Sequence, residues 1–380
     1  MALSDVYTKD SIRAVDAKFE AQKIAFAPLA FQAVRALREL GILRALSVAG
    51  EGGLSREEAA AGADISVYGA GVLLEMALGL GVVKFAPAGQ RPPAAGGEEP
   101  EPPERAERFV LAKTGWFLLE DEMTAVNFNF VNDICYKGAF SLVDSVRSGR
   151  PEGLKVFGEN WSTIYEALAS LPEGPKKSWF AFDHFYSDIA FPEALPPVFA
   201  RKPRRLLDIG GNTAKWALQC CRYDPDVAVT VADLPGQAAV AEKAAAAAGF
   251  SERISVYPCD VLDPAAALPA GMDALWMSQF LDCFSPEDIT GILKKAAAVC
   301  GEGTDVWVLE PLWDKQRFEA ASFSLQAAGL YFTCMANGRS KMYRFEELRA
   351  AVEKGGFVLK EARHDLGANC YSLLRFVKRP

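Results

Sequence analysis

At 380 residues the chain is longer than one typical domain, and half of its residues are apolar, so two domains with substantial buried cores are expected. A formal net charge of −8 argues against nucleic acid as a partner, and no apolar run approaches the length of a membrane helix. Eight cysteines without metal-ligand spacing and only two histidines argue against a zinc site and indicate reduced thiols in the cytoplasm.

The first 120 residues are predicted to form a domain that resembles a winged helix. Apolar residues recur at helical spacing from Leu29 to Leu40, and further helices are expected at 54–60, with a Ser cap, and at 67–80. Strands are expected at 82–85 and, on the return, at 109–115. The helix that would read DNA, 66–81, contains Glu75 but neither Lys nor Arg, which argues against DNA binding.

Two segments of different composition follow these elements. Residues 87–107 are rich in Pro, Gly, Ala and Glu, and they are expected to form a flexible loop because they bury too little apolar surface to order themselves. Residues 121–200 are expected to form a helical connector. Its aromatic run over 179–186 includes His184 and leads into the third segment.

Residues 201–380 alternate strands with helices, which is the pattern of a parallel α/β sheet. Strands are expected at 206–209, 229–232, 254–257, 274–277 and 306–309. Two more, 357–359 and 371–376, are too close together for a crossover helix and should form an antiparallel hairpin. An antiparallel last strand is typical of methyltransferase sheets.

Two of these strands end in the acids and glycines of a nucleotide site. Asp208 is followed after one residue by Gly210 and Gly211, and Asp233 ends the next strand. Such glycines let the backbone approach a ligand, and an acid on the second strand accepts hydrogen bonds from ribose hydroxyls. The third glycine of a dinucleotide motif is missing, and Asp208 would repel a pyrophosphate but attract the ammonium group of a methionine-type ligand. The motif therefore favours S-adenosylmethionine over NAD.

This combination resembles the two-domain, S-adenosylmethionine-dependent O-methyltransferases that act on small, often aromatic molecules, such as the plant phenylpropanoid, acetylserotonin and bacterial polyketide enzymes. The resemblance covers nearly the whole chain. It implies a Rossmann-like class I methyltransferase domain over 201–380 and an N-terminal winged helix used for homodimerisation. Residues 208–214 look like the family's Asp-Val-Gly-Gly-Gly-x-Gly loop, with Asn212 and Ala214 in place of two of its glycines.

The resemblance also implies which residues hold the cofactor. Asp233 matches the ribose-binding acid, and the pair Asp260-Val261 resembles the Asp-Phe pair that flanks the adenine. Ser278 stands where the family often has a Lys near the cofactor. The expected cofactor-binding residues are Asp208, Gly210, Gly211, Asn212, Asp233, Leu234, Asp260, Val261 and Ser278.

The catalytic positions depart from the family pattern. Asp282 occupies the place of the His that takes the proton from the substrate hydroxyl, and Ser340 occupies the place of the second supporting Glu. The first supporting Glu remains as Glu310. Asp282 is expected either to act as the base, with its pKa raised by burial, or to be structural, as a helix cap or an ion-pair partner. His184 is the other candidate for the base or a substrate contact, and otherwise a packing residue.

The expected function is S-adenosylmethionine-dependent methylation of a small aromatic or polyketide-like molecule, with oxygen as the first choice of acceptor and nitrogen and carbon left open. Two alternatives remain. One is a cofactor-binding relative that has changed its reaction, of the decarboxylase or hydroxylase type, and the other is a non-catalytic dimeric binding protein. A homodimer is expected, without a metal ion, a nucleic acid or a membrane as partner.

Overall fold

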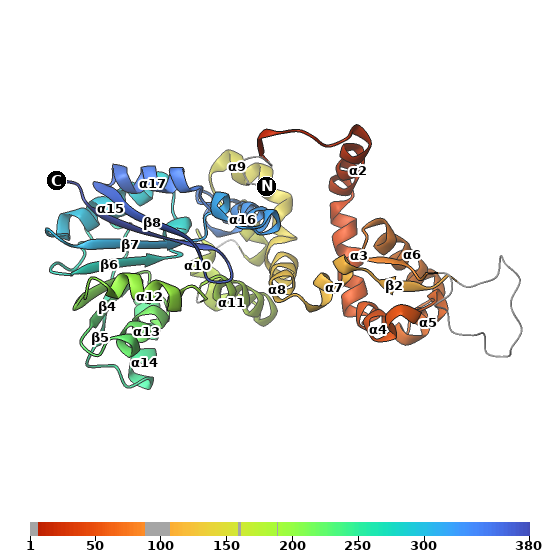
Figure 1. The fold of residues 1–380 in the computed structure, drawn as a ribbon, viewed down its shortest axis with the longest axis horizontal. Helices are drawn as coiled ribbons and strands as arrows, with labels where there is room; N and C mark the ends of the chain where they lie inside the picture. The colour runs from red at the N-terminus through yellow and green to blue at the C-terminus, as the bar shows by residue number, and fades with distance from the viewer. Residues whose placement is uncertain (1–6, 88–106, 159–160, 188) are drawn as a thin grey trace, which may run out of the picture. The chain divides into compact units, whose positions relative to one another are not determined.

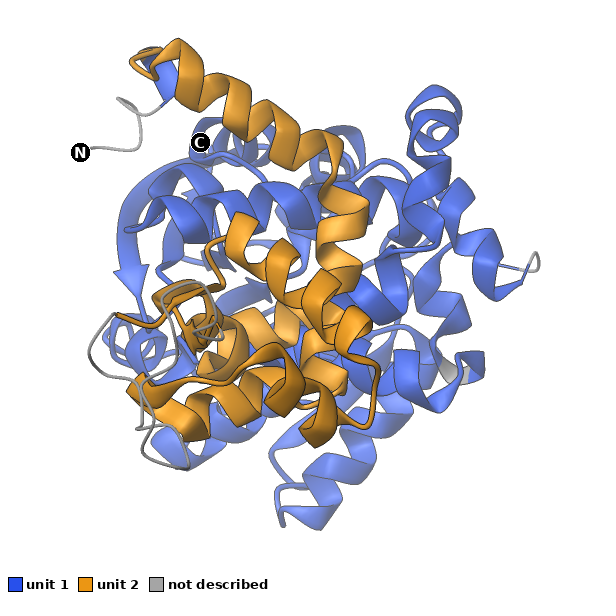
Figure 2. Cartoon of the chain, turned by 90° about the vertical axis from the view of Figure 1, so that its right-hand side faces the viewer, with its two compact units in different colours: residues 1–8, 129–380 blue, residues 9–128 orange. Residues whose placement is uncertain are grey.

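The computed structural model describes residues 7–87, 107–158, 161–187 and 189–380. They form two compact units, one of residues 9–128 and one of residues 1–8 with 129–380, which Figure 2 colours orange and blue. Most of the loop expected at 87–107 lies outside the described residues. None of the described helices is long and apolar enough to span a membrane by itself, although the bent pair Arg56–Ala63 and Val67–Gly79 has the necessary length and composition when taken together.

The smaller unit is mainly helical, as expected from its apolar spacing. Its helices are α2 (Ala14–Ala25), α3 (Ala27–Glu39), α4 (Ile42–Ala49), α5 (Arg56–Ala63), α6 (Val67–Gly79), α7 (Lys113–Glu120) and most of α8 (Glu122–Phe130). The Ser cap predicted at the start of α5 is confirmed, because Ser55 Oγ accepts a hydrogen bond from the Glu58 amide at 3.2 Å and the Glu58 carboxylate accepts one from the Ser55 amide at 2.9 Å.

Two short strands complete this unit. β1 (Val83–Phe85) pairs antiparallel with β2 (Phe109–Leu111), as the sequence predicted. The returning strand was expected to reach residue 115, but it ends at Leu111 and α7 begins at Lys113. Gly115 is instead the third residue of α7, where it packs so closely that a side chain would overlap the Val82 carbonyl oxygen and the Leu111 side chain.

The connector expected at 121–200 is helical. It contains α9 (Leu142–Ser148), α10 (Ile164–Ala167), α11 (Glu173–Ser187) and α12 (Phe191–Phe199), with tighter or wider helical turns at Val131–Cys135, Gly138–Ser141, Glu152–Phe157 and Leu168–Ser170. Aromatic side chains hold it together. The Phe130 and Phe182 rings stack with centroids 3.9 Å apart, and Trp179 Nε1 donates a hydrogen bond to the Tyr331 hydroxyl at 2.7 Å.

The larger unit contains the predicted sheet, in the order β5-β4-β3-β6-β7-β9-β8 (Figure 1). The strands are β3 (Arg205–Ile209), β4 (Ala228–Asp233), β5 (Ile254–Pro258), β6 (Ala274–Ser278), β7 (Asp305–Glu310), β8 (Phe357–Leu366) and β9 (Tyr371–Lys378). β3 to β7 pair in parallel, and β9 runs antiparallel to both of its neighbours, which confirms the expected hairpin and the antiparallel last strand.

Helices cover both faces of this sheet. α12, α13 (Lys215–Tyr223) and α14 (Pro235–Ala247) pack on one face, and α15 (Pro286–Val299) and α17 (Phe345–Lys354) pack on the other (Figure 1). The first core includes Trp216 and Trp276, whose rings stack with centroids 3.7 Å apart and an interplanar angle of 9°. α16 (Glu319–Tyr331) belongs instead to the aromatic core of the connector. All six residues of β7 are buried, as expected for a strand covered on both faces.

Candidate active site

Four predicted site residues lie at the carboxyl ends of adjacent parallel strands. Asp208 is near the end of β3, and Asp233, Ser278 and Glu310 are the last residues of β4, β6 and β7. β3 pairs with β4 on one side and with β6 on the other, so the strand order reverses between β3 and β6. In open α/β sheets ligands bind at this kind of reversal, beyond the carboxyl ends of the strands.

The loop after β3 requires both of its glycines. Gly210 has a φ of +77°, and a side chain there would overlap the Phe280 ring. A Cβ atom on Gly211 would lie 2.5 Å from Asp208 Oδ2. Asn212 and Ala214, which replace two glycines of the family motif, keep left-handed conformations with φ of 45° and 59°. The loop therefore has the conformation of a glycine-rich loop although only two glycines remain in it.

Asp208 is buried beneath this loop. Its residue is 2% exposed, and its Oδ2 atom has no hydrogen-bond partner among the residues that the structure describes. Burial raises the pKa of Asp208 to about 8, with a smaller contribution from the charge of Asp233. A buried carboxylate without a partner is costly, so Asp208 is suited to bind a cationic group that approaches the loop.

Asp233 links the glycine loop to β4. Its Oδ2 atom accepts a hydrogen bond from the Asn212 amide at 2.8 Å, and its Oδ1 atom accepts one from the Leu234 amide at 2.7 Å. Gln237 Nε2 donates to Asn212 Oδ1 at 3.0 Å. Burial raises the pKa of Asp233, and the two amide bonds oppose that shift. Each carboxylate oxygen keeps a lone pair for a further donor such as a ribose hydroxyl.

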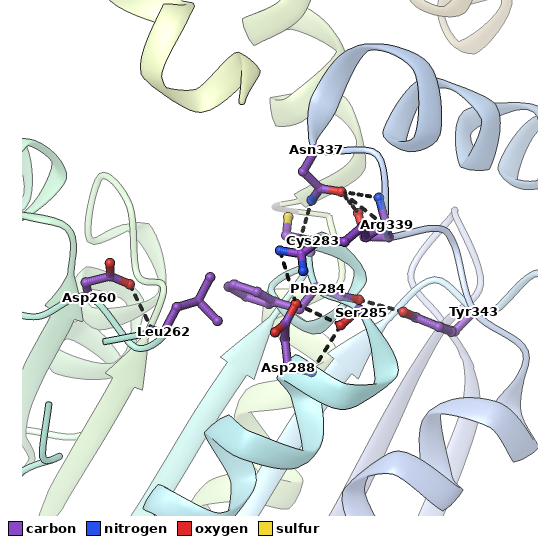
Figure 3. A network of polar contacts seen from close by, with 10 residues as sticks. Asp260, Leu262, Cys283, Phe284, Ser285, Asp288, Asn337, Arg339 and Tyr343 are labelled. Atoms are coloured by element: carbon purple, nitrogen blue, oxygen red, sulfur yellow. Dashed lines mark hydrogen bonds and ion pairs between the residues drawn. The ribbon is translucent and has the colours of Figure 1, made fainter. Parts of the chain in front are cut away.

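The other expected cofactor residues lie after neighbouring strands. Asp260 follows β5, and its Oδ1 atom accepts a hydrogen bond from the Leu262 amide at 2.9 Å (Figure 3). Val261 is buried against the core that contains Ile209 and Met277. The Ser278 Oγ atom is buried and has no hydrogen-bond partner within the described part of the chain.

Asp282 lies in a tight turn, Leu281–Cys283, between β6 and α15. It is 5% exposed, and Cys283 Sγ donates to its Oδ1 atom at 3.5 Å, while the Tyr165 hydroxyl donates to Cys283 Sγ at 3.2 Å. Burial raises the pKa of Asp282 to about 7, with a further increase from the charge of Asp183 and a partial decrease from the Cys283 hydrogen bond. The carboxyl group is therefore poised to exchange a proton near neutral pH.

The structural alternatives for Asp282 do not match this geometry. Ser285 caps α15, since its Oγ atom accepts a hydrogen bond from the Asp288 amide at 3.1 Å. Over the ranges that the structure describes, Asp282 forms no ion pair with Lys, Arg or His.

Glu310 supports the Asp282 turn from the end of β7. Its Oε1 atom accepts hydrogen bonds from the Phe280 and Leu281 amides at 3.1 and 2.9 Å. Its Oε2 atom is buried and has no partner in the described residues. Burial, and next the charge of Asp282, raise the pKa of Glu310 well above its usual range, whereas the amide hydrogen bonds lower it. The Asp282 carboxylate is therefore close enough to Glu310 to disfavour ionisation of both groups at once.

His184 lies in a different place from this pair. It is on α11, its Nδ1 atom is 2.9 Å from Lys215 Nζ, and its ring stacks on Phe180. Lys215 is the first residue of α13, directly after the glycine loop. Asp183, which comes directly before His184 in the sequence, is the residue whose charge raises the pKa of Asp282. The structure thus brings Asp282 and Glu310 together and puts His184 beside the glycine loop.

Several side chains around the pair were not among the predicted site residues. Tyr371 starts β9 beside the end of β7, is fully buried, and its hydroxyl has no partner among the described residues. The charges of Asp282 and Glu310 add to the effect of burial in raising the pKa of Tyr371. Cys283 is next to Asp282 in the sequence, so the sequence could have identified it as a site residue. No local sequence pattern identifies Tyr371.

The segment 337–343, which precedes α17, forms hydrogen bonds to the Asp282 turn and to the residue after it (Figure 3). Asn337 Nδ2 donates to the Cys283 carbonyl at 2.7 Å, and the Tyr343 hydroxyl donates to the Phe284 carbonyl at 2.5 Å. Ser340, at the position of the missing second Glu, is buried and donates through Oγ to Asn337 Oδ1 at 3.1 Å. The Asp282 turn is therefore held from two sides, by Glu310 and by Asn337.

Curated proteins similar in sequence include methyltransferases and one hydroxylase. L-tyrosine C(3)-methyltransferase of Streptomyces lavendulae is 24% identical over 228 residues, which are 60% of this chain and 61% of that protein. 3-hydroxy-5-methyl-1-naphthoate 3-O-methyltransferase of Streptomyces sahachiroi is 33% identical over 30% of this chain and 32% of its own length. Aclacinomycin 10-hydroxylase RdmB of Streptomyces purpurascens is 26% identical over 47% of this chain and 45% of its own. The chain thus matches about six-tenths or less of the length of these relatives.

Solved structures and family models cover more of the chain. The apo form of the S-adenosylmethionine-dependent methyltransferase SibL matches with a TM-score of 0.67 and 24% identity, over 94% of this chain and 98% of that one, which shows a shared fold. A Dimerisation2-like domain model matches residues 18–89, and an O-methyltransferase domain model matches residues 140–358. The chain therefore belongs to the O-methyltransferase domain family.

Proposed function

We propose that this protein is an S-adenosylmethionine-dependent methyltransferase that modifies a small aromatic or polyketide-like molecule, with oxygen as the expected acceptor. The observation that carries the proposal is the buried Asp208 carboxyl beneath Gly210 and Gly211, because its unpartnered oxygen suits the ammonium group of the cofactor. Asp233 provides the carboxylate for the ribose hydroxyls. The cofactor, when bound, supplies a methyl group on a sulfonium, and transfer of this group requires alignment and exclusion of water.

In this proposal Asp282 takes the proton from the substrate hydroxyl. A general base works best when its pKa lies near the working pH, and burial raises the pKa of Asp282 to about 7. Glu310 keeps the turn in place through the Phe280 and Leu281 amides. Turnover should fall as the pH drops below about 7, because a protonated carboxyl group cannot accept the proton.

A second candidate is a relative that binds the same cofactor and carries out a different reaction, of the decarboxylase or hydroxylase type. Asp282 and Ser340 at the positions of the family's His and Glu favour it, and one of the similar proteins is a hydroxylase. The same replacements are also consistent with a protein that binds the cofactor but catalyses no reaction.

We also propose a homodimer formed through the smaller unit, in the cytoplasm. The match to a Dimerisation2-like domain supports the dimer. So do the exposed apolar side chains of α2 and α3, which include Val15, Phe19, Ile24 and Leu29. All eight cysteines are free thiols, which supports a reducing compartment.

Two measurements test the function. Calorimetric titration should show binding of S-adenosylhomocysteine, with a loss of about tenfold or more in Asp233→Ala, because a charged acceptor contributes about 1.5–3 kcal/mol. Methyl transfer to a panel of phenols should fall about 10²-fold in Asp282→Asn, with nearly unchanged cofactor affinity. His184→Gln tests the second candidate base in the same assay.

The outcomes separate the candidates. Tight NAD binding, or an unchanged affinity in Asp233→Ala, would reject the cofactor assignment. Full turnover in Asp282→Asn would reject Asp282 as the base, and loss only in His184→Gln would transfer the role to His184. Cofactor binding without transfer to any acceptor would favour the second candidate or a binding protein.

A further inference from the structure

The segment that follows β5 has no regular structure of its own. Residues 259–273, all of which the structure describes, contain neither a helix nor a strand. The Leu262 amide donates to Asp260 Oδ1 at 2.9 Å, and the Asp263 amide donates to the Asp260 carbonyl at 3.1 Å, so residues 260–263 form a turn (Figure 3). These local hydrogen bonds shape the turn but do not attach it to the rest of the protein.

Lys295 of α15 attaches the turn. Its Nζ atom donates to the Val261 carbonyl at 2.8 Å and also to the Asp263 carbonyl. Within the described residues its ammonium group has no carboxylate partner, so its charge-assisted hydrogen bonds go to these two carbonyls. Val261 is also buried in the same core as Ile292 and Ala296 of α15. The turn is therefore fixed to α15 by two hydrogen bonds and by apolar packing.

The position of the ribose acid puts the base of the cofactor beside this turn. Asp233 ends β4, and β5 lies next to β4 at the edge of the sheet. The Cys259 amide donates to the Asp233 carbonyl at 2.8 Å, so the turn begins next to the ribose acid. In the proposed function Asp208 on β3 takes the ammonium group of the cofactor. The base then lies on the opposite side of Asp233, beside residues 260–263.

We propose that Lys295 is a positioning residue, which holds the turn 260–263 in the place where it recognises the base of the cofactor. It acts through the Val261 and Asp263 carbonyls and does not touch the base. This inference rests on the proposed function, since it concerns the same cofactor. A purely structural residue would affect the binding of every ligand equally, whereas loss of Lys295 should weaken recognition of the base.

Recognition of the base can be measured by changing one group on it. Asp260 is exposed, and its Oδ1 atom accepts the Leu262 amide, so its Oδ2 atom is available to the amino group of adenine. Hypoxanthine has a carbonyl oxygen in place of this amino group, and a carboxylate repels it. A turn that is held in place should therefore prefer adenine, and a turn released from α15 should lose part of this preference.

The test compares S-adenosylhomocysteine with S-inosylhomocysteine, which differ in this group of the base. Calorimetric titration of the native protein should show at least about tenfold tighter binding of S-adenosylhomocysteine. Lys295→Met keeps the apolar stem and removes the donor. S-adenosylhomocysteine should bind to this variant about five- to tenfold more weakly, with a smaller loss for S-inosylhomocysteine, so the ratio of the two affinities should fall.

Two further variants serve as controls. Lys295→Arg keeps a cationic donor and should retain most of the native ratio. Lys294→Met should retain all of it, because Lys294 is exposed and forms no hydrogen bond or ion pair in the described part of the chain.

Amide hydrogen exchange provides a second measurement, which needs no variant. Saturation of the native protein with S-adenosylhomocysteine should slow exchange over residues 259–266, where the Leu262, Asp263 and Ala266 amides donate within the segment. In Lys295→Met without ligand, the same residues should exchange faster than in the native protein, with β4 unchanged.

An unchanged affinity for S-adenosylhomocysteine in Lys295→Met, or an equal loss for both ligands, would overturn the inference. So would unchanged exchange over residues 259–266 when the native protein binds the ligand. Failure of the native protein to bind S-adenosylhomocysteine would instead overturn the proposed function.

Discussion

Replacement of Asp208 by Asn should stabilise the ligand-free protein at neutral pH and weaken its binding of the cofactor. Asp208 is buried, one of its oxygens has no partner within the described residues, and burial raises its pKa from 3.8 to about 8. An acid whose pKa is raised by folding contributes most to stability below its unfolded pKa, and that contribution is lost as the pH rises towards its folded pKa. At neutral pH the burial of Asp208 therefore lowers the free energy of unfolding of the native protein.

The magnitude follows from the proton balance. Between pH 5 and 7 the folded protein retains about one proton on Asp208 that the unfolded chain has lost, so stability falls by about 1.4 kcal/mol per pH unit. Over these two pH units the free energy of unfolding of the native protein should decrease by about 2.7 kcal/mol because of this residue alone. The amide of Asp208→Asn does not titrate, so this part of the pH dependence should disappear.

Urea denaturation of both proteins at about pH 5 and pH 7 measures the difference directly. The free energy of unfolding should fall less steeply with pH in Asp208→Asn than in the native protein, by on the order of 1 kcal/mol per unit. Glu302→Gln, at an exposed position, should follow the native slope. Affinity for S-adenosylhomocysteine should drop about tenfold or more in Asp208→Asn. Identical slopes in native and variant proteins would refute the argument.

Two further predictions concern the glycine loop and the smaller unit. Gly211→Ala should destabilise the protein by about 1–3 kcal/mol in urea, because its Cβ atom would lie 2.5 Å from Asp208 Oδ2. Gly236→Ala in α14 has open space around its Cβ position and should be neutral or stabilising by up to about 1 kcal/mol, so equal effects would contradict the packing argument. Light scattering at micromolar concentration should give twice the mass of one chain, and a monomer would contradict the proposed dimer.

The sheet and the turn of acids and glycines at its carboxyl edge could be predicted because their signals are local. An apolar run that ends in Asp208, Gly210 and Gly211 defines both a strand and the turn after it, and Asp233 ends the next strand in the same way. Short spacing between the last two strands was enough to predict their antiparallel pairing.

The surroundings of Asp282 could not be predicted in this way. Adjacent residues of a helix point about 100° apart, so the rotation of α11 decides whether Asp183 or His184 faces the pair, and tertiary packing sets that rotation. Tyr371 reaches the site only because β9 pairs with β7. Its contribution depends on a contact between segments more than sixty positions apart, which no local pattern contains.

The stacked indoles of Trp216 and Trp276 have an optical consequence. Their centroids are 3.7 Å apart and their planes nearly parallel, so the excited states of the two rings couple. Where the in-plane transition dipoles of the two rings are not parallel, such coupling gives a paired positive and negative band in circular dichroism, and it depends steeply on the separation and relative orientation of the rings. Trp216 is the second residue of α13, directly after the glycine loop, whereas Trp276 lies in the centre of β6. A small displacement of the start of α13 would therefore change this coupling, which gives the protein an intrinsic spectroscopic probe of its glycine loop.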